Sequence, residues 1–107
     1  MAIYLEIKTP ESVHQFILNF MNKTEIDIEG EFDSVNYGEG YDFKVKKVPC
    51  RLYDETINFN IEITNDHEHC VNIEIDKFNR FSQESQTECS VIIKQNITQS
   101  NIIEEIY

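Results

Sequence analysis

Residues 3–21 read IYLEIKTPESVHQFILNFM, and within them the hydrophobic period changes from two to 3.6. Apolar and polar side chains alternate over residues 3–8, which predicts a half-buried strand. From Val13 onward, apolar residues return at offsets of three, four, seven and eight, which predicts an amphipathic helix with one buried stripe. Thr9 is the predicted N-cap, because a proline and an acid follow it, and the helix is expected to end near Asn22.

After this helix the period of two returns and continues through most of the chain. The strands predicted from it cover residues 24–33, 41–46, 57–64, 71–76 and 88–96. Pro49 is expected to end its strand or to mark a sheet edge. Residues 36–40 and 79–87 are polar and are expected to be loops.

The tail, with apolar residues at 102, 103 and 106, suits either a short helix capped by Thr98 or Ser100 or a final strand. Hairpin-length connections, such as the one between 57–64 and 71–76, favour antiparallel pairing. We therefore expect a single domain over residues 1–107 with an α+β fold. It would be a mostly antiparallel, curled sheet of five to six strands packed by one N-terminal helix, with a short C-terminal helix as one interpretation of the tail.

The charge balance of the chain limits its partners. Twenty acids and nine bases give a net charge of −11 over 107 residues. Such a chain repels nucleic acid and anionic membranes and is attracted to basic protein surfaces, although solubility alone also accounts for acidity. No apolar stretch approaches the length of a membrane span, and the first eight residues lack the features of a signal peptide, so we expect a cytoplasmic protein.

Acidic residues alternate with apolar ones in the segment that follows the first helix. On a regular strand they would share one face, and a basic partner would relieve their mutual repulsion. The alternative is a solvated edge strand whose charges prevent aggregation. The five residues of this predicted acidic stripe are Glu25, Asp27, Glu29, Glu31 and Asp33.

A second acidic group, on two neighbouring predicted strands, would extend the same surface. It consists of Glu62, Glu74 and Asp76. Aromatic side chains often anchor protein interfaces, and we expect Tyr37 or Tyr41 to supply that contact, with Tyr53 as a third choice. Core or loop packing accounts for these tyrosines equally well.

Residue types that carry chemistry are few and are not arranged in motifs. Cys50, Cys70 and Cys89 are odd in number and show no CxxC spacing, so buried free thiols are expected. His67 and His69 next to Cys70 are ligand types for a transition metal, but no second matching pair exists and a polar loop explains them better. No nucleophile lies beside a base and no phosphate loop is present, so we predict no cofactor and no enzymatic activity, with an enzyme built from distant residues as the alternative.

Taken together, the size, the charge, the acidic stripe and the lack of catalytic motifs resemble the profile of immunity proteins from contact-dependent growth inhibition and other bacterial polymorphic toxin systems. The resemblance implies a monomeric acidic inhibitor that binds a basic toxin domain, expected to be a nuclease, and covers its active site. It carries no residue-level motif. Phage-encoded anti-defence and nucleic-acid-mimic inhibitors share this profile. A structural or adaptor homodimer, formed through an exposed sheet edge, is a third class.

Overall fold

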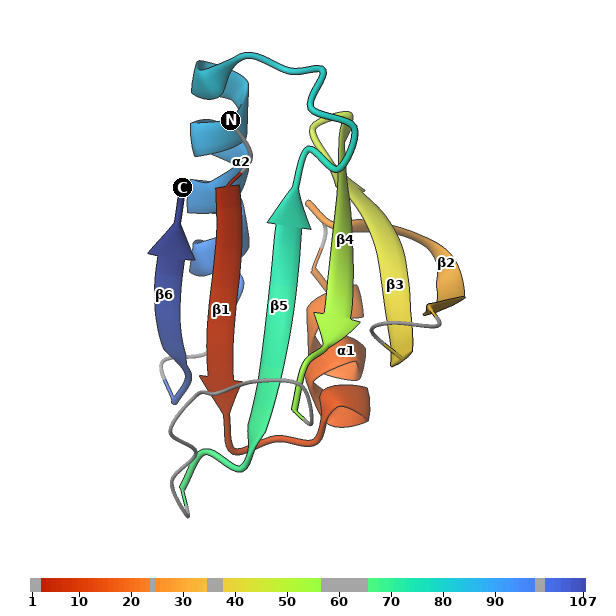
Figure 1. Cartoon of the computed structure of the whole chain (residues 1–107), viewed down its shortest axis with the longest axis vertical. Coiled ribbons are helices and arrows are strands. Elements are labelled where there is room, and N and C mark those ends of the chain that lie inside the picture. The colour runs from red at the N-terminus through yellow and green to blue at the C-terminus, as the bar shows by residue number, and fades with distance from the viewer. Residues whose placement is uncertain (1–2, 24, 35–37, 57–65, 98–99) are drawn as a thin grey trace.

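The computed structural model describes residues 3–23, 25–34, 38–56, 66–97 and 100–107. Six strands form one antiparallel sheet in the order β2-β3-β4-β5-β1-β6, and two helices lie against one of its faces (Figure 1). The predicted α+β class is therefore confirmed. The strands are β1 (Ile3–Thr9), β2 (Asp27–Ser34), β3 (Gly38–Val45), β4 (Val48–Asp54), β5 (His69–Ile75) and β6 (Ile102–Ile106), and the helices are α1 (Val13–Met21) and α2 (Gln83–Gln95).

The core lies between the sheet and the two helices. Ile3, Leu5 and Ile7 of β1 are completely buried, and the polar residues between them point to the other face, as the alternation predicts. Along α1 the predicted stripe is also confirmed where its side chains are described. Phe20 meets Phe43 of β3 edge to face, with ring centroids 5.2 Å apart. Burying such side chains is the main favourable term for a domain of this size.

The start of α1 differs from the prediction, because Ser12 rather than Thr9 is the N-cap. The Ser12 Oγ accepts a hydrogen bond from the Gln15 amide at 3.1 Å. Thr9 remains the last residue of β1, opposite His69, and its hydroxyl accepts from the Glu11 amide instead. Strand pairing thus delays the helix by three residues, while its predicted end at Asn22 is confirmed.

Strand β4 was not predicted, and Pro49 does not end the strand before it, because β3 ends at Val45. Lys46 and Lys47 both have positive φ (47° and 69°) and form a two-residue turn between β3 and β4. Pro49 is the second residue of β4, a strand that lies between β3 and β5. It pairs with Lys44 of β3 but lies beyond the residues that pair with β5, which begin at Arg51. Its missing N–H therefore breaks no ladder with β5.

Helix α2 occupies residues 83–95, so the predicted strand at 88–96 is wrong and the predicted loop at 79–87 holds only up to Ser82. Ser82 caps the helix by accepting from the Ser85 amide at 3.2 Å. Its buried stripe contains Gln86 and Ser90, and polar residues at core positions hid the helical period. The Val-Ile-Ile run at 91–93 added a misleading strand preference. For the tail, the strand interpretation is right, since Ile102–Ile106 forms β6.

The neighbours of β5 also differ from the prediction. Residues 57–64, the expected hairpin partner, lie outside the described residues. Both edges of β5 are occupied by other strands, β1 on one side and β4 on the other. Ile3 lies opposite Ile75, so the pairing of β1 with β5 joins residues from the two halves of the chain.

Candidate functional site

The predicted acidic stripe does not keep one face of the sheet. Strand β2 contains a bulge, and the register shifts between Ile28 and Gly30. Before the bulge, Asp27 pairs with Lys44. After it, Glu31 pairs with Tyr41, which belongs to the opposite face of β3. The expectation that five carboxylates share a face is therefore wrong, because one inserted residue reverses the alternation.

Three members of the stripe form an exposed group, which we call the acidic edge: Glu25, Asp27 and Glu29. Strand β2 is an outer strand of the described sheet. Glu29 lies 3.1 Å from the Lys44 ammonium, in an ion pair whose two side chains are about half and a third exposed. A side chain at Gly30 would meet no atom within 4 Å, so the space beside the acidic edge is open. The side chains of Glu31 and Asp33 lie outside the described part of the structure.

The second predicted acidic group is not an exposed patch. Asp76 is 1% exposed and has a positive φ of 57°. Its carboxylate accepts hydrogen bonds from the amides of Arg80 (3.1 Å) and Phe81 (2.8 Å) and from the Gln86 side chain (2.9 Å). Asp76 therefore holds the connection between β5 and α2. Glu74 of β5 alternates with the buried Ile73 and Ile75 and lies on the face away from the helices. Glu62 falls outside the described residues.

The tyrosines do not form one patch. Tyr41 lies opposite Leu52 on the helix side of the sheet and packs against the core. It lines a hollow of about 270 Å³ beside α1. Tyr53 belongs to the other face, opposite Asn72 of β5, and Tyr37 lies outside the described residues. No single aromatic anchor next to the acidic edge follows from the described tyrosines.

Both described helices lie on one side of the sheet (Figure 1), and the opposite face carries a cluster of paired charges. The Asp42 carboxylate accepts from the Arg51 Nε at 2.8 Å and lies 2.8 Å from the Lys77 ammonium, whose side chain is only 7% exposed. Burial alone would raise the pKa of Asp42, but the hydrogen bonds from Arg51 and Lys77 outweigh it and lower the pKa. The same contact with Asp42 raises the pKa of Arg51.

Two carboxyl groups on the same face, those of Glu6 and Glu55, have raised pKa values. Burial, and then repulsion from Glu104, raises the pKa of Glu6. Burial, and then repulsion from Asp54, raises the pKa of Glu55. Burial next to these carboxylates raises the pKa of the Cys70 thiol to about 12. Glu6 was visible in the alternation of β1, whereas nothing in the local sequence marked Glu55 as buried.

The residues considered for metal binding are engaged in other contacts. A ring nitrogen of His67 (Nε2) is 2.8 Å from the carbonyl oxygen of Ser100, and Cys70 is completely buried. Within the described ranges, no group of three or more His, Cys, Asp or Glu side chains is placed to hold a metal ion. All three cysteines are buried free thiols, as predicted. Neither described helix is long and apolar enough to cross a membrane.

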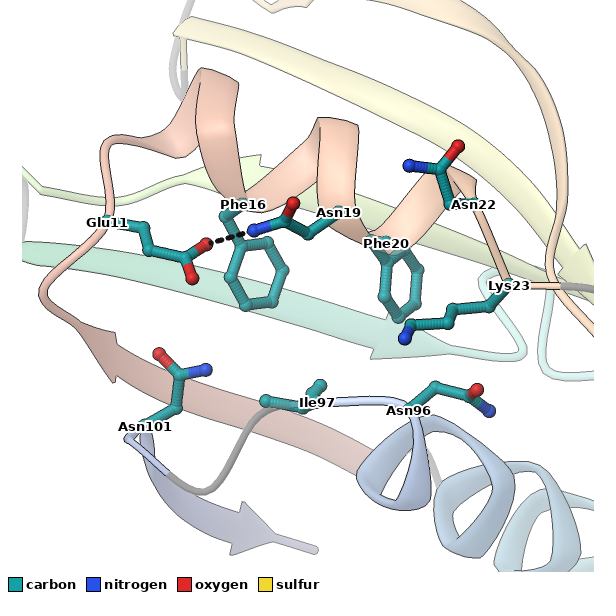
Figure 2. Close-up of a pocket in the computed structure, with 9 residues that line it drawn as sticks. All are labelled: Glu11, Phe16, Asn19, Phe20, Asn22, Lys23, Asn96, Ile97 and Asn101. Carbon is teal, nitrogen blue, oxygen red and sulfur yellow. Dashed lines mark hydrogen bonds between the residues drawn. The ribbon is translucent and has the colours of Figure 1, made fainter.

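A pocket of about 320 Å³ lies on the helix side, between α1, the C-terminal end of α2 and the start of β6 (Figure 2). Its apolar part is formed by Phe16, Phe20 and Ile97. Sequence reasoning missed this pocket, because its lining comes from three segments that only the tertiary fold brings together. Among the described residues, its polar lining comes from Glu11, Asn19, Asn22, Lys23, Asn96 and Asn101.

Comparisons with known proteins give no relative: no family model, no curated protein and no solved structure matches this chain.

Proposed function

We propose that this protein is an immunity-type inhibitor, which binds a basic toxin domain, a nuclease in our proposal, and covers its active site. The observation that carries the proposal is the acidic edge on an outer strand, in a chain of net charge −11. Carboxylates on such an edge can form charge-assisted hydrogen bonds with arginine and lysine. They also accelerate encounter with a basic surface.

Most of the described acids take no part in the ion pairs of the protein. Among the residues whose side chains the structure describes, five bases pair with four acids, and twelve acids and four bases stand outside these pairs. Glu25 and Asp27 are exposed, and neither belongs to one of these pairs. The acidic edge therefore retains charge with which to attract a cationic surface.

The edge also offers room for close approach. The bulge interrupts regular pairing of β2, and the open space beside Gly30 admits a partner side chain or backbone. A nuclease that binds nucleic acid through lysine and arginine presents the complementary charge at its substrate cleft. Occupying that cleft would block the substrate by charge and by volume.

The test is a paired charge reversal. Glu25→Lys with Asp27→Lys should abolish capture of a basic toxin domain from lysate of the source cells. The control reverses the same number of charges elsewhere, at exposed Asp66 and Glu68, and should retain capture. Equal binding by wild type and the acidic-edge variant would refute the proposed interface. Loss in both variants would assign the effect to net charge rather than to this edge.

A second candidate function, a homodimeric adaptor, is favoured by the opposite end of the sheet. Strand β6 is the other outer strand; Ile102 at its start is 52% exposed, and Tyr107, directly after its end, is 63% exposed. An outer strand with exposed apolar residues can pair with a second copy. Sedimentation velocity distinguishes the two functions. A dimer that Ile102→Lys converts to a monomer would support the adaptor function, and a monomeric wild-type protein would refute it.

A further inference from the structure

We propose that the pocket between α1 and α2 is a binding site for a short peptide with free termini, three or four residues long. Its lining shares no residue with the acidic edge, although Lys23 stands two residues before Glu25, and the proposal does not depend on the inhibitor function. The proposal rests on the distribution of charge, amide and apolar groups along the pocket.

The two ends of the pocket carry opposite charges. Figure 2 shows the Glu11 carboxylate at one end and the Lys23 side chain entering from the other, beside Phe20 and Ile97. The five ion pairs of the described residues include neither Glu11 nor Lys23. A ligand with an ammonium at the Glu11 end and a carboxylate at the Lys23 end would match both charges.

The polar groups at the Glu11 end suit an amine. Asn19 donates a hydrogen bond to one oxygen of Glu11 at 3.0 Å, which holds the carboxylate toward the pocket. The Asn101 side chain extends toward the same end (Figure 2). Side-chain carboxamides carry the same donor and acceptor as a peptide group, so they can pair with the backbone of a peptide ligand.

The middle of the pocket is apolar and accepts a hydrophobic side chain. Phe16 and Phe20 stack with ring centroids 6.0 Å apart, and Ile97 faces them from beyond the end of α2. The volume of about 320 Å³ is at the lower end of the range for small-ligand pockets. An aliphatic side chain in the centre of the ligand would contact all three residues.

The length of the pocket selects the length of the peptide. Glu11 and Lys23 flank α1, whose nine residues rise by about 13 Å, and both side chains turn inward, with the Glu11 carboxylate bonded to Asn19, so the two charges lie closer together than the helix is long. An extended peptide advances roughly 3.3 Å per residue, so the upper limit of about 13 Å corresponds to four residues, and a tripeptide of about 10 Å lies within it. A single amino acid has both charges on one carbon and cannot reach the two ends together.

The experiment is a titration of the isotope-labelled protein, followed by NMR, with the tripeptide Ala-Leu-Ala, its N-acetylated form and its C-amidated form. The free peptide should shift the side-chain amides of Asn19 and Asn101 and the backbone amide of Ile97. Each blocked form loses one charged contact and should bind about tenfold more weakly. Absence of shifts at these residues, or equal affinity for free and blocked peptides, would overturn the proposal.

Substitutions at Glu11 and Lys23 test which terminus of the peptide binds at each end of the pocket. In Lys23→Gln the free and amidated peptides should bind alike, and in Glu11→Gln the free and acetylated peptides should bind alike. Lys47→Gln removes an exposed lysine from the β3–β4 turn and should keep the full discrimination. Lys23→Arg and Glu11→Asp preserve the charges and should retain it as well, which guards against misfolded variants. Discrimination that survives in Lys23→Gln and Glu11→Gln would contradict the assigned orientation.

The acidic-edge variant separates this site from the proposed function. Glu25→Lys with Asp27→Lys should bind the tripeptide as wild type does, whether or not it still binds a toxin domain. A parallel loss of peptide binding in that variant would contradict an independent site.

Discussion

Two cations, the Arg51 guanidinium and the Lys77 ammonium, contact the Asp42 carboxylate. Lys77 is almost fully buried, and Asp42 is its ion-pair partner among the described residues. We expect Asp42→Asn to lower the free energy of unfolding by about 2 to 3 kcal/mol, since it leaves a buried ammonium without its counter-charge. Urea denaturation at pH 7 measures this change. Glu29→Gln breaks an exposed pair and should change stability by less than about 1 kcal/mol. Equal effects of the two variants would contradict the burial argument.

Glu6 should make the protein more stable as the pH falls. Burial and Glu104 raise its pKa in the folded state above the ordinary value of 4.5, while Lys8 opposes them. The folded state therefore holds this proton more tightly, and stability rises as the pH falls through the raised pKa, with the gain complete below 4.5. Glu6→Gln should be more stable than wild type at pH 7, by up to about 1 kcal/mol, and the difference should vanish near pH 4. Thermal unfolding of both proteins from pH 4 to 7 would show whether the difference depends on pH.

At the scale of elements, the connection from β5 to α2 depends on one side chain. Asp76 accepts three hydrogen bonds from residues 80, 81 and 86 while its own backbone has positive φ. Asparagine tolerates a positive φ, but its side-chain NH2 group would replace one carboxylate oxygen and would face N–H groups that are also donors. We expect Asp76→Asn to cost about 2 kcal/mol and to increase hydrogen exchange in the first turn of α2. Asp66→Asn, at an exposed position, serves as the control and should leave exchange unchanged.

At the scale of the whole molecule, self-repulsion of the net charge should limit stability at low salt. The radius of gyration is 12.9 Å. The screening length is about 30 Å at 0.01 M salt and about 3 Å at 1 M, so charges interact across the entire domain only at low salt. We expect the melting temperature to rise with sodium chloride, because the unpaired acids outnumber the exposed ion pairs that salt weakens. A falling melting temperature would show that the ion pairs dominate instead.

Local periodicity predicted the elements whose buried positions are apolar. Strand β1 and helix α1 were predicted because Ile3, Leu5 and Ile7, and then Phe16 and Phe20, occupy the buried positions of their respective periods. Helix α2 was missed because Gln86 and Ser90 occupy two of its buried positions. The acidic edge was predicted in part, as Glu25, Asp27 and Glu29 are exposed but the bulge separates them from Glu31.

By itself, the sequence determined the α+β class, the strand–helix unit at the start and the strong negative charge. Those properties follow from composition and from the spacing of apolar residues, which act within a few positions of the chain. Tertiary structure alone decided the place of β1 between β5 and β6, the bulge in β2, the convergence of Arg51 and Lys77 on Asp42, and the pocket between α1 and α2. Each of these features joins segments that are distant in sequence or reverses a local period. The packing of the whole domain determines which strand lies at each edge of another strand and which group lies next to a buried charge.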